Sequence, residues 1–506
     1  MNILIANRGE IAVRLVRACR EMGHTSVAVY SDVDRTQPHV LAADLAVRVG
    51  PAPARESYLD VGKVLDAART AGADAVHPGY GFLAENADFA RAVIDAGLVW
   101  IGPPPEVIEL LGSKTAAREL ARKVGVPVVP GSEILPDTAA AAAFAEAAGY
   151  PVLLKAVGGG GGKGMREVRG PEALAEAFER ARSEGRAFFS DDRVYAEKLI
   201  ERPRHIEVQI LGDRHGNLVH FGERECSLQR RHQKVLEEAP SVAVDPALRH
   251  RLGEAALAVA RAAGYRSAGT VEFLLAPSGE FYFLEVNTRL QVEHPVTEMV
   301  YGVDLAQLMI AEAAGEAIGI RQEDVVPRGH AMECRVYAED PLHGFSPSPG
   351  TIQLLERPGG PGVRVDSGVR AGSLVPLDYD PIVAKLIVWA EDRPRVLRRL
   401  ERALAEYRIT GIATTLPLFR LLLDVPEFQR ADLHTGLLDQ LLQQGSVEAL
   451  EAVGDPELEE VAIVAAACLA ARDAGRIPAD GFESAEREGR AWREDGRRAA
   501  HGRPTR

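Results

Sequence analysis

TVEFLLAPSGEFYFLEVNTRLQVEHP, residues 270–295, is the stretch around which the rest of the chain is organised. Two strand-like runs flank the turn Pro277–Glu280, which is typical of a β-hairpin. If the runs pair about this turn, Glu272 faces Glu285. Because strand side chains alternate between two faces, one face is predicted to be a core face made of Val271, Phe273, Leu275, Leu284 and Val286. The other face collects Glu272, Leu274, Phe283, Glu285 and Asn287.

The polar face of this hairpin predicts a cation site. Two facing carboxylates repel each other, so Glu272 and Glu285 favour a positive charge between them. With Asn287 they supply the oxygen ligands that Mg²⁺ or Mn²⁺ prefers. A solvated polar face is the alternative for the hairpin alone. The polar residues that follow directly favour a functional site: Arg289, Gln291, Glu293 and His294.

Length and composition bound the class of protein. A chain of 506 residues is too long for one core and predicts roughly two to four domains. The net charge of −14 argues against nucleic-acid binding. No signal peptide or membrane-length apolar run is present, so we expect a cytoplasmic protein without a membrane partner. The cysteines show no metal-type spacing and are interpreted as reduced thiols: Cys19, Cys226, Cys334 and Cys468.

Residues 2–112 alternate between strand-like and helix-like segments. NILIAN (2–7) and TSVAVYS (25–31) are predicted strands, and residues 10–23 form an amphipathic helix between them. Further strands are expected at residues 74–79 and 98–103, separated by a helix over 60–72. This alternation predicts a parallel sheet with crossover helices. The first strand-to-helix turn has one glycine, so a dinucleotide fingerprint is absent.

The segment YPVLLKAVGGGGGKGM (150–165) combines a buried strand carrying Lys155 with five glycines and Lys163. A glycine run lets backbone N–H groups approach phosphate oxygens closely. It is not a Walker loop, because Gly164 follows the lysine. A flexible hairpin tip is the alternative, but the preceding lysine favours a mobile flap that covers phosphate.

Two helices are predicted before this segment. Ser113 caps a helix that carries Lys114 in its first turn, and residues 138–149 form an Ala-rich helix.

One further segment carries a dense polar pattern. Residues 229–234, QRRHQK, form either a solvated loop or part of a polyphosphate site. Only eight of the 59 basic residues are lysines. Because lysine is a compact point charge and arginine a planar fork, the retained lysines indicate sites that need a point charge. Five of them lie in the stretches described here: Lys114, Lys155, Lys163, Lys198 and Lys234.

The C-terminal third is predicted to be an α+β unit over residues 330–440. It begins with a strand carrying Arg335 and continues with the strand IVAKLIVWA (382–390) and a helix over 393–407. From residue 441 the composition changes, with one Ala-rich helix and then a charged, Arg-rich end. We predict a helical extension and a disordered tail over 441–506.

Five segments together resemble biotin carboxylase, the ATP-grasp component of acetyl-CoA carboxylase and its relatives. The resemblance covers roughly residues 2–440, in the family's order. Its motifs are ANRGEIA (6–12), HPGYGFLAENA (77–87), KAVGGGGGKGM (155–165), ECSLQRRHQKVLEEAP (225–240) and EVNTRLQVEHPVTE (285–298). It implies an N-terminal α/β domain (1–112), an ATP-grasp core (113–317) with a glycine-rich lid at about 130–203, and a C-terminal α+β domain (330–440).

The resemblance also implies the reaction. MgATP or MnATP, bicarbonate and biotin would give ADP, phosphate and carboxybiotin, by way of carboxyphosphate. This is the first half-reaction of acetyl-CoA carboxylase and supports fatty acid synthesis; a subunit of another acyl-CoA or pyruvate carboxylase is the alternative. No Ala-Met-Lys triplet occurs in the chain, so the biotin is expected on a separate carrier protein. Carboxyltransferase subunits and a second copy of this chain are the other expected partners.

Residue roles follow from the matched motifs. Glu272, Glu285 and Asn287 would hold the metal. Bicarbonate would be bound by Lys234, Arg289, Gln291 and Val292, with Glu293 as its base. Arg335 would stabilise the biotin enolate, so the catalytic set is Arg289, Glu293, Arg335 and Lys234. The nucleotide would be contacted by Lys114, Lys155, Gly161, Gly162, Glu197, Lys198, Leu199, Ile200, His205, Gln229, His232, Leu274, Glu272 and Glu285.

Two positions depart from the family pattern. Lys163 stands in the lid where many relatives have arginine, and Pro361 stands where some relatives place an aromatic residue near their dimer contact. Two other functions compete with this interpretation. A different ATP-grasp ligase is disfavoured by the RLQVEHP stretch. A non-catalytic nucleotide sensor would lack a metal ligand or the base, and all of these residues are present.

Overall fold

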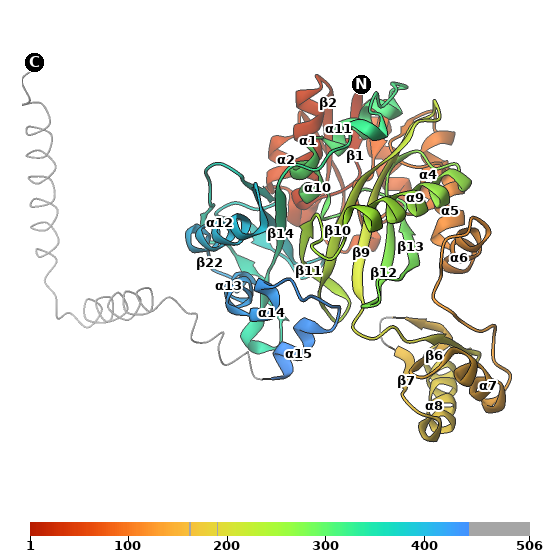
Figure 1. Cartoon of the computed structure of the whole chain (residues 1–506). Helices are drawn as coiled ribbons and strands as arrows, with labels where there is room; N and C mark the ends of the chain where they lie inside the picture. Colours follow the sequence, from red (N-terminus) through yellow and green to blue (C-terminus); the bar gives the residue numbers. More distant parts are fainter. Residues whose placement is uncertain (161–162, 190, 445–506) are drawn as a thin grey trace, which may run out of the picture. The chain divides into compact units, whose positions relative to one another are not determined.

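The computed structural model describes residues 1–160, 163–189 and 191–444, which belong to one compact unit (Figure 1). Gly161 and Gly162, and most of the predicted extension and tail over 441–506, lie outside the described residues. No helix among the described residues has both the length and the apolar character needed to cross a membrane.

The N-terminal part is a five-stranded parallel sheet in the order β3-β2-β1-β4-β5. The predicted alternation of strand and helix is confirmed, and one further strand, β3, follows α2. The strands are β1 (Asn2–Ile5), β2 (Thr25–Ser31), β3 (Leu45–Gly50), β4 (Ala75–His77) and β5 (Val99–Trp100). The helices are α1 (Gly9–Glu21), α2 (Pro38–Ala42), α3 (Val61–Thr70), α4 (Ala87–Asp95) and α5 (Pro105–Gly112).

A helix precedes the predicted lid, which is built on a small three-stranded sheet. Helix α6 (Lys114–Lys123) begins at Ser113, whose hydroxyl accepts a hydrogen bond from the Ala116 N–H at 3.4 Å. The sheet has the order β7-β6-β8, and α8 packs on its strands β6 and β7 (Figure 1). Its elements are α7 (Thr138–Ala148), β6 (Val152–Gly160), β7 (Lys163–Val168), α8 (Pro171–Phe189) and β8 (Val194–Lys198).

An eight-stranded sheet forms the centre, in the order β13-β12-β9-β10-β11-β14-β21-β19. It runs across the predicted boundary near residue 330, because β11 pairs with β14 through Leu236 and Cys334. Its strands are β9 (Arg204–Gly212), β10 (Leu218–Arg230), β11 (Gln233–Ala239), β12 (Ser267–Leu275), β13 (Phe281–Asn287), β14 (His330–Tyr337), β19 (Val363–Ser367) and β21 (Ile382–Ala390). The helices that follow its first strands are α9 (Pro246–Ala262), α10 (His294–Tyr301) and α11 (Leu305–Ala313).

The hairpin β12–β13 confirms the predicted pairing of Glu272 with Glu285. The register shifts by one residue immediately after Glu272, so Phe273 pairs with Phe283. The predicted core face is therefore wrong for part of β13. Phe283 is buried in the core that lines α9, whereas Leu284 is only half-buried. A bulge inserts one extra residue and turns the later side chains to the opposite face.

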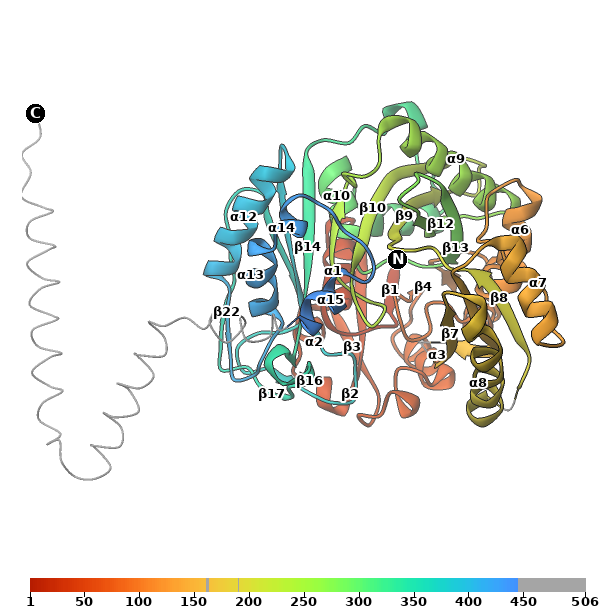
Figure 2. The ribbon, with the colours of Figure 1, turned by 60° about the horizontal axis from the view of Figure 1, so that its bottom comes forward.

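The C-terminal part is the expected α+β unit. Helix α12 packs on β14 and β21 and against α13 (Figure 2). The helices are α12 (Arg393–Glu406), α13 (Leu416–Asp424), α14 (Pro426–Gln429) and α15 (Leu437–Gln443). Short strands complete it: β15 (Glu339–Asp340), β16 (Ser346–Pro347), β17 (Gly350–Thr351), β18 (Leu354–Glu356), β20 (Leu374–Val375) and β22 (Arg408–Thr410).

Candidate active site

The centre of the site is the ammonium group of Lys234 on β11. Its Nζ lies 2.6 Å from Glu207 on β9, 2.9 Å from Glu272 on β12 and 2.7 Å from Glu293. The three carboxylates are buried. They meet because β9, β11 and β12 belong to one sheet, and Glu293 immediately precedes α10. One cation thus balances part of a buried triple negative charge.

The charges in this cluster fix its protonation. Burial alone would lower the pKa of Lys234, but the carboxylates of Glu207, Glu272 and Glu293 raise it well above its ordinary value. Burial would raise the pKa of Glu293, but Lys234, Arg335 and Arg224 hold it well below its ordinary value. At neutral pH the amine is therefore charged and the Glu293 carboxylate is ionised.

Arg335 reaches the cluster from β14. Its Nη2 donates to Glu293 at 3.0 Å and its Nε donates to Glu237 at 2.6 Å. Both carboxylates come from other elements, whereas an ordinary surface ion pair of Arg335 would use an acidic residue on its own strand. Burial raises the pKa of Glu237 to about 7, although Arg335 opposes this rise. A residue expected to act on biotin therefore directly contacts the expected base for bicarbonate.

The side chains of the RLQ segment (289–291) contact the β12–β13 hairpin, on which the metal ligands were predicted. Arg289 donates to Gln291 at 2.8 Å and to Asn287 at 3.0 Å. The amides of Asn287 and Gln291 donate to Glu272 at 2.8 and 3.2 Å. Arg289 also donates to Glu85 at 2.9 Å. The structure thus brings Arg289, Gln291 and Glu272 together, as the sequence predicted.

The predicted metal ligands fit a hard divalent cation by their chemistry. Glu272 and Glu285 face each other across the hairpin, and each already has a cationic partner. Lys114 lies 3.0 Å from Glu285, while Lys234 and His205 contact Glu272 at 2.9 and 3.0 Å. A second grouping among the described residues could also hold a cation: His205, Glu207 and Glu272.

The predicted nucleotide contacts fall into two groups. In the lid sheet, Glu197 forms ion pairs with Lys155, at 2.5 Å, and with Arg118. Lys198 donates to the backbone carbonyls of Gly149 and Tyr150 at 2.8 and 3.0 Å. In the central sheet, His205 contacts Gln229 at 2.9 Å and pairs with Leu274. His232 lies in the tight β10–β11 turn, with φ of 66°.

Sequence reasoning missed several residues of this cluster. Glu207 and Arg224 are fully buried and paired at 2.5 Å, and Arg224 also donates to Gln209 at 2.7 Å. The signal was a charged residue in the strand HIEVQIL (205–211), where His205, Glu207 and Gln209 alternate with apolar residues. Cys226 lies 4.0 Å from Glu293. Glu85 belongs to a matched motif, but its role as the partner of Arg289 was not predicted.

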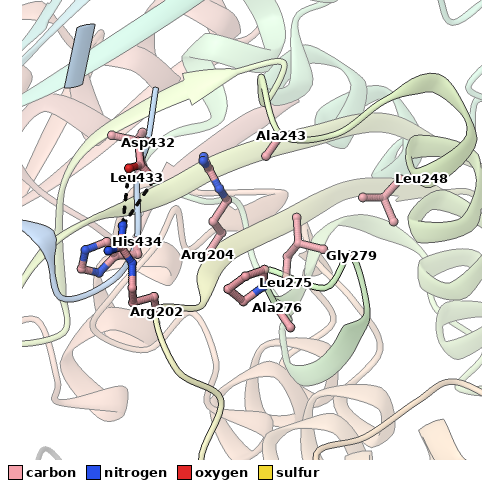
Figure 3. A pocket seen from close by; sticks show the side chains of 11 residues that line it. Arg202, Arg204, Ala243, Leu248, Leu275, Ala276, Gly279, Asp432, Leu433 and His434 are labelled. Carbon is pink, nitrogen blue, oxygen red and sulfur yellow. Dashed lines mark hydrogen bonds and ion pairs between the residues drawn. The ribbon is translucent and has the colours of Figure 1, made fainter. Parts of the chain in front are cut away.

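A separate cavity of about 480 Å³ lies beside the turn of the hairpin (Figure 3). Arg202, Arg204 and His434 line its polar side, and Leu248 and Leu275 line its apolar side. Arg204 is paired with Glu225 at 3.1 Å, and Arg202 lies 3.4 Å from Asp432. None of the predicted site residues is among the described residues that line it. This cavity is therefore distinct from the Lys234 cluster.

Three family models match successive parts of the chain. They are described as "Biotin carboxylase, N-terminal domain" over residues 1–108, "Carbamoyl-phosphate synthase L chain, ATP binding domain" over 113–321 and "Biotin carboxylase C-terminal domain" over 333–440. The chain is 51% identical over 440 residues to a biotin carboxylase of Nostoc sp., covering 87% of this chain and 98% of that protein. It is 50% identical to a pyruvate carboxylase subunit of Methanothermobacter thermautotrophicus, over 87% of this chain and 89% of that protein.

Solved structures give the same picture. The biotin carboxylase–β,γ-ATP complex of Campylobacter jejuni superposes with a TM-score of 0.81 at 44% identity, over 87% of this chain and 98% of that one. The biotin carboxylase domain dimer of Hydrogenobacter thermophilus 2-oxoglutarate carboxylase, in complex with MgADP, ADP and bicarbonate, gives a TM-score of 0.80 at 45% identity, over 88% and 98%.

Proposed function

This chain belongs to the biotin carboxylase family and is an ATP-grasp ligase, and from that premise we propose that it carboxylates biotin on a separate carrier protein as a subunit of acetyl-CoA carboxylase. The observation that supports this role most directly is the Lys234–Glu293–Arg335 contact. It joins the groups proposed for bicarbonate to the group proposed for biotin. A homodimer in the cytoplasm is part of the same proposal.

Bicarbonate activation is assigned to residues of the Lys234 cluster. Lys234, Arg289, Gln291 and the Val292 segment would hold the anion beside Glu293. The ionised Glu293 can accept a proton, but a pKa far below neutrality makes a weak base. Binding of bicarbonate to Lys234, and of biotin to Arg335, would loosen their hold on Glu293 and raise its basicity. Substrate binding and base strength are coupled in this way.

Arg335 is assigned to the second half of the reaction. Its guanidinium would meet negative charge that develops on the ureido oxygen of biotin, which is how positioned donors stabilise a transition state. Glu237 holds the Nε side of the guanidinium at 2.6 Å and so fixes the plane of the fork. Nη2 is then directed toward Glu293 and the bicarbonate groups.

Nucleotide binding is assigned to both sheets. Lys155 and Lys114 carry positive charge suited to phosphate oxygens, while Glu197 and Leu274 frame the base. Glu272, Glu285 and Asn287 would hold Mg²⁺ or Mn²⁺, which would offset charge on the ATP phosphates when bound. In the described structure, Lys155 is paired with Glu197 and Lys114 with Glu285. Phosphate must compete with these carboxylates for the two lysines.

The test is ATP cleavage with and without bicarbonate and free biotin. We expect ATP cleavage that depends on bicarbonate, is stimulated by biotin and yields carboxybiotin. ATP cleavage that is indifferent to bicarbonate would contradict the assignment. Replacement of bicarbonate by an amine or carboxylic acid substrate would instead identify a different ATP-grasp ligase.

The final acceptor needs its own test, because the pyruvate and 2-oxoglutarate carboxylase relatives are about as similar as the others. The purified chain is combined with the carrier protein and, in turn, with each carboxyltransferase of the same cell. Transfer to acetyl-CoA supports the proposal. Transfer to pyruvate or another acyl-CoA alone would reassign the chain to a different carboxylase while leaving its biotin carboxylation intact.

A further inference from the structure

Lys385 on β21 is a fully buried lysine that the resemblance did not assign. Its Nζ donates to the backbone carbonyl of Val292 at 2.7 Å and lies 3.1 Å from the Glu10 carboxylate. In the sheet it pairs with Arg335 on the neighbouring strand. Lys385 is therefore the cross-strand neighbour of Arg335, and its side chain ends on the segment that carries Gln291 and Glu293.

The anchor of Lys385 is itself held firmly. Glu10 is in the first turn of α1, is buried, and accepts a hydrogen bond from the Tyr80 hydroxyl. A Cβ added at Gly368 would lie 2.5 Å from the backbone nitrogen of Glu10, so α1 approaches the C-terminal part closely at this point. Burial alone would lower the pKa of Lys385, but Glu10, Glu333 and Asp366 raise it, so the ammonium stays charged.

The backbone of the segment that Lys385 contacts is also held at the neighbouring residue, Gln291. The carbonyl of Gln291 accepts from Nδ1 of His294 at 2.7 Å, and the next carbonyl, that of Val292, accepts from Lys385. Burial and nearby cations hold the pKa of His294 well below its ordinary value, so its ring is neutral. The carbonyl groups of two consecutive residues, Gln291 and Val292, are thus each held by a hydrogen bond from a side chain. Fixing them also fixes where the side chains of Gln291 and Glu293 project.

We infer that Lys385 is a positioning residue for bicarbonate: anchored on Glu10 of the N-terminal part, it holds the Val292 peptide so that the segment 289–293 is preorganised for the anion. This inference rests on the proposed function of that segment. A lysine suits the position because one ammonium has three donors and can serve a carboxylate and a carbonyl from different directions. Lysine is also rare in this chain, at eight of 59 basic residues.

A purely structural ion pair makes a different prediction from a positioning residue. Removing Lys385 alone would leave Glu10 buried without its cation, which would destabilise the protein under either account. The decisive variant is therefore the double substitution Glu10→Gln with Lys385→Met, which removes both charges together. Under the structural account it restores stability and all kinetic constants. Under the positioning account, stability also returns, but the Val292 carbonyl lacks the hydrogen bond that Lys385 donates.

The experiment measures bicarbonate-dependent ATP cleavage in the full chain, with KM values for bicarbonate and for ATP and a thermal melt. For the double variant we expect KM for bicarbonate to rise by about tenfold or more, as for a lost charged hydrogen bond, while KM for ATP changes less than about twofold. A control removes a partly buried pair elsewhere in the same unit, Arg249→Met with Glu223→Gln, whose atoms lie 2.7 Å apart. It should leave KM for bicarbonate unchanged.

A second variant keeps the test decisive if the double variant does not fold. Lys385→Arg preserves the charge beside Glu10, but its planar fork cannot reproduce the point contact with Val292, so KM for bicarbonate should again rise selectively. A wild-type KM for bicarbonate in whichever variant folds would overturn the inference. If the unmodified chain cleaves ATP without any dependence on bicarbonate, the proposed function fails instead, and the two failures are distinguishable.

Discussion

At the scale of single residues, the site contains more buried carboxylates than cations that contact them, so each cation is shared. Lys234 contacts three of them, and Arg335 contacts two, sharing Glu293 with Lys234. Burying charge is costly unless each group is paired. In the proposed function, bicarbonate would replace the negative charge of the carboxylate that it displaces from Lys234. The ureido group of biotin is neutral and would bring only hydrogen-bonding atoms to Arg335.

Glu237 gives a pH prediction at this scale. Its pKa is raised to about 7 from an ordinary 4.5, chiefly by burial. Between these values the folded chain binds more protons at this site than the unfolded chain does. This contribution to stability is therefore present at low pH and is lost as pH rises through about 7. Glu237→Gln, which cannot ionise, should remove this loss, which is on the order of 3 kcal/mol.

The measurement is urea unfolding of both proteins at a series of pH values between about 5 and 8. The wild-type free energy of unfolding should fall relative to that of Glu237→Gln across this window. Parallel curves for the two proteins would show that Glu237 is ionised throughout. Activity is a separate readout, because the glutamine still offers an oxygen to the Nε of Arg335.

Sequence reasoning found the residues that lie in distinctive motifs and missed those that only the sheet brings together. Lys234, Arg289 and Glu293 stand in dense polar runs, which ordinary strands do not contain. Glu207 and Arg224 each lie on a buried strand among several other polar residues, and the sequence does not reveal which of these residues pair. Their pairing depends on the β9–β10 register, in which Glu207 is opposite Arg224.

At the scale of elements, the β12–β13 hairpin shows both the reach and the limit of pattern reasoning. The alternation of side chains predicted the Glu272–Glu285 pair correctly, because that part of the hairpin is regular. The same alternation failed at Phe283 and Leu284, because a bulge lies beside Glu272. A bulge adds one residue without leaving a clear sequence signal. It also occurs next to the proposed metal ligands, where bulges often adjust side-chain direction.

The hairpin also allows a matched test of the metal site. Glu285→Gln keeps the shape of the side chain but removes a ligand charge, so the Mg²⁺ concentration needed for half-maximal ATP cleavage should rise about tenfold or more. Glu280→Gln is the control, because Glu280 is an exposed residue at the turn of the same hairpin. Thermal melts should show similar stability for both. An unchanged Mg²⁺ requirement in Glu285→Gln would remove Glu285 from the metal ligands.

At the scale of the whole molecule, the central sheet brings together the residues proposed for two steps of the reaction, the activation of bicarbonate and the carboxylation of biotin. The resemblance implied an ATP-grasp core over 113–317, and the strand and helix patterns predicted a separate C-terminal α+β unit over 330–440. In the structure, β14 and β21 extend the same sheet that carries Lys234. Pairing between strands so distant in the chain cannot be deduced from local patterns. This continuity places Arg335, from beyond residue 330, against Glu293.

The last prediction uses the contact between Arg335 and Glu293 to separate the carboxylation of biotin from the activation of bicarbonate. Arg335→Ala would leave both Glu237 and Glu293 without a buried partner, so a loss of activity could come from misfolding. Arg335→Lys keeps a positive charge for the two carboxylates but loses the planar fork that can serve biotin and Glu237 together. A donor that acts in the transition state lowers turnover more than binding when it is lost. Biotin carboxylation by Arg335→Lys should therefore fall on the order of a hundredfold.

Three assays on the same preparation decide this prediction: carboxybiotin formation, KM for ATP and thermal stability. The KM for ATP should stay within about twofold, because Arg335 contacts carboxylates and, among the described residues, none of the lid residues proposed for the nucleotide. Glu293→Gln provides the contrast, since loss of the base should depress bicarbonate-dependent ATP cleavage as well as carboxylation. If Arg335→Lys instead loses ATP affinity and carboxylation to the same extent, Arg335 stabilises the structure of the central sheet as a whole. Its assignment to biotin is then wrong.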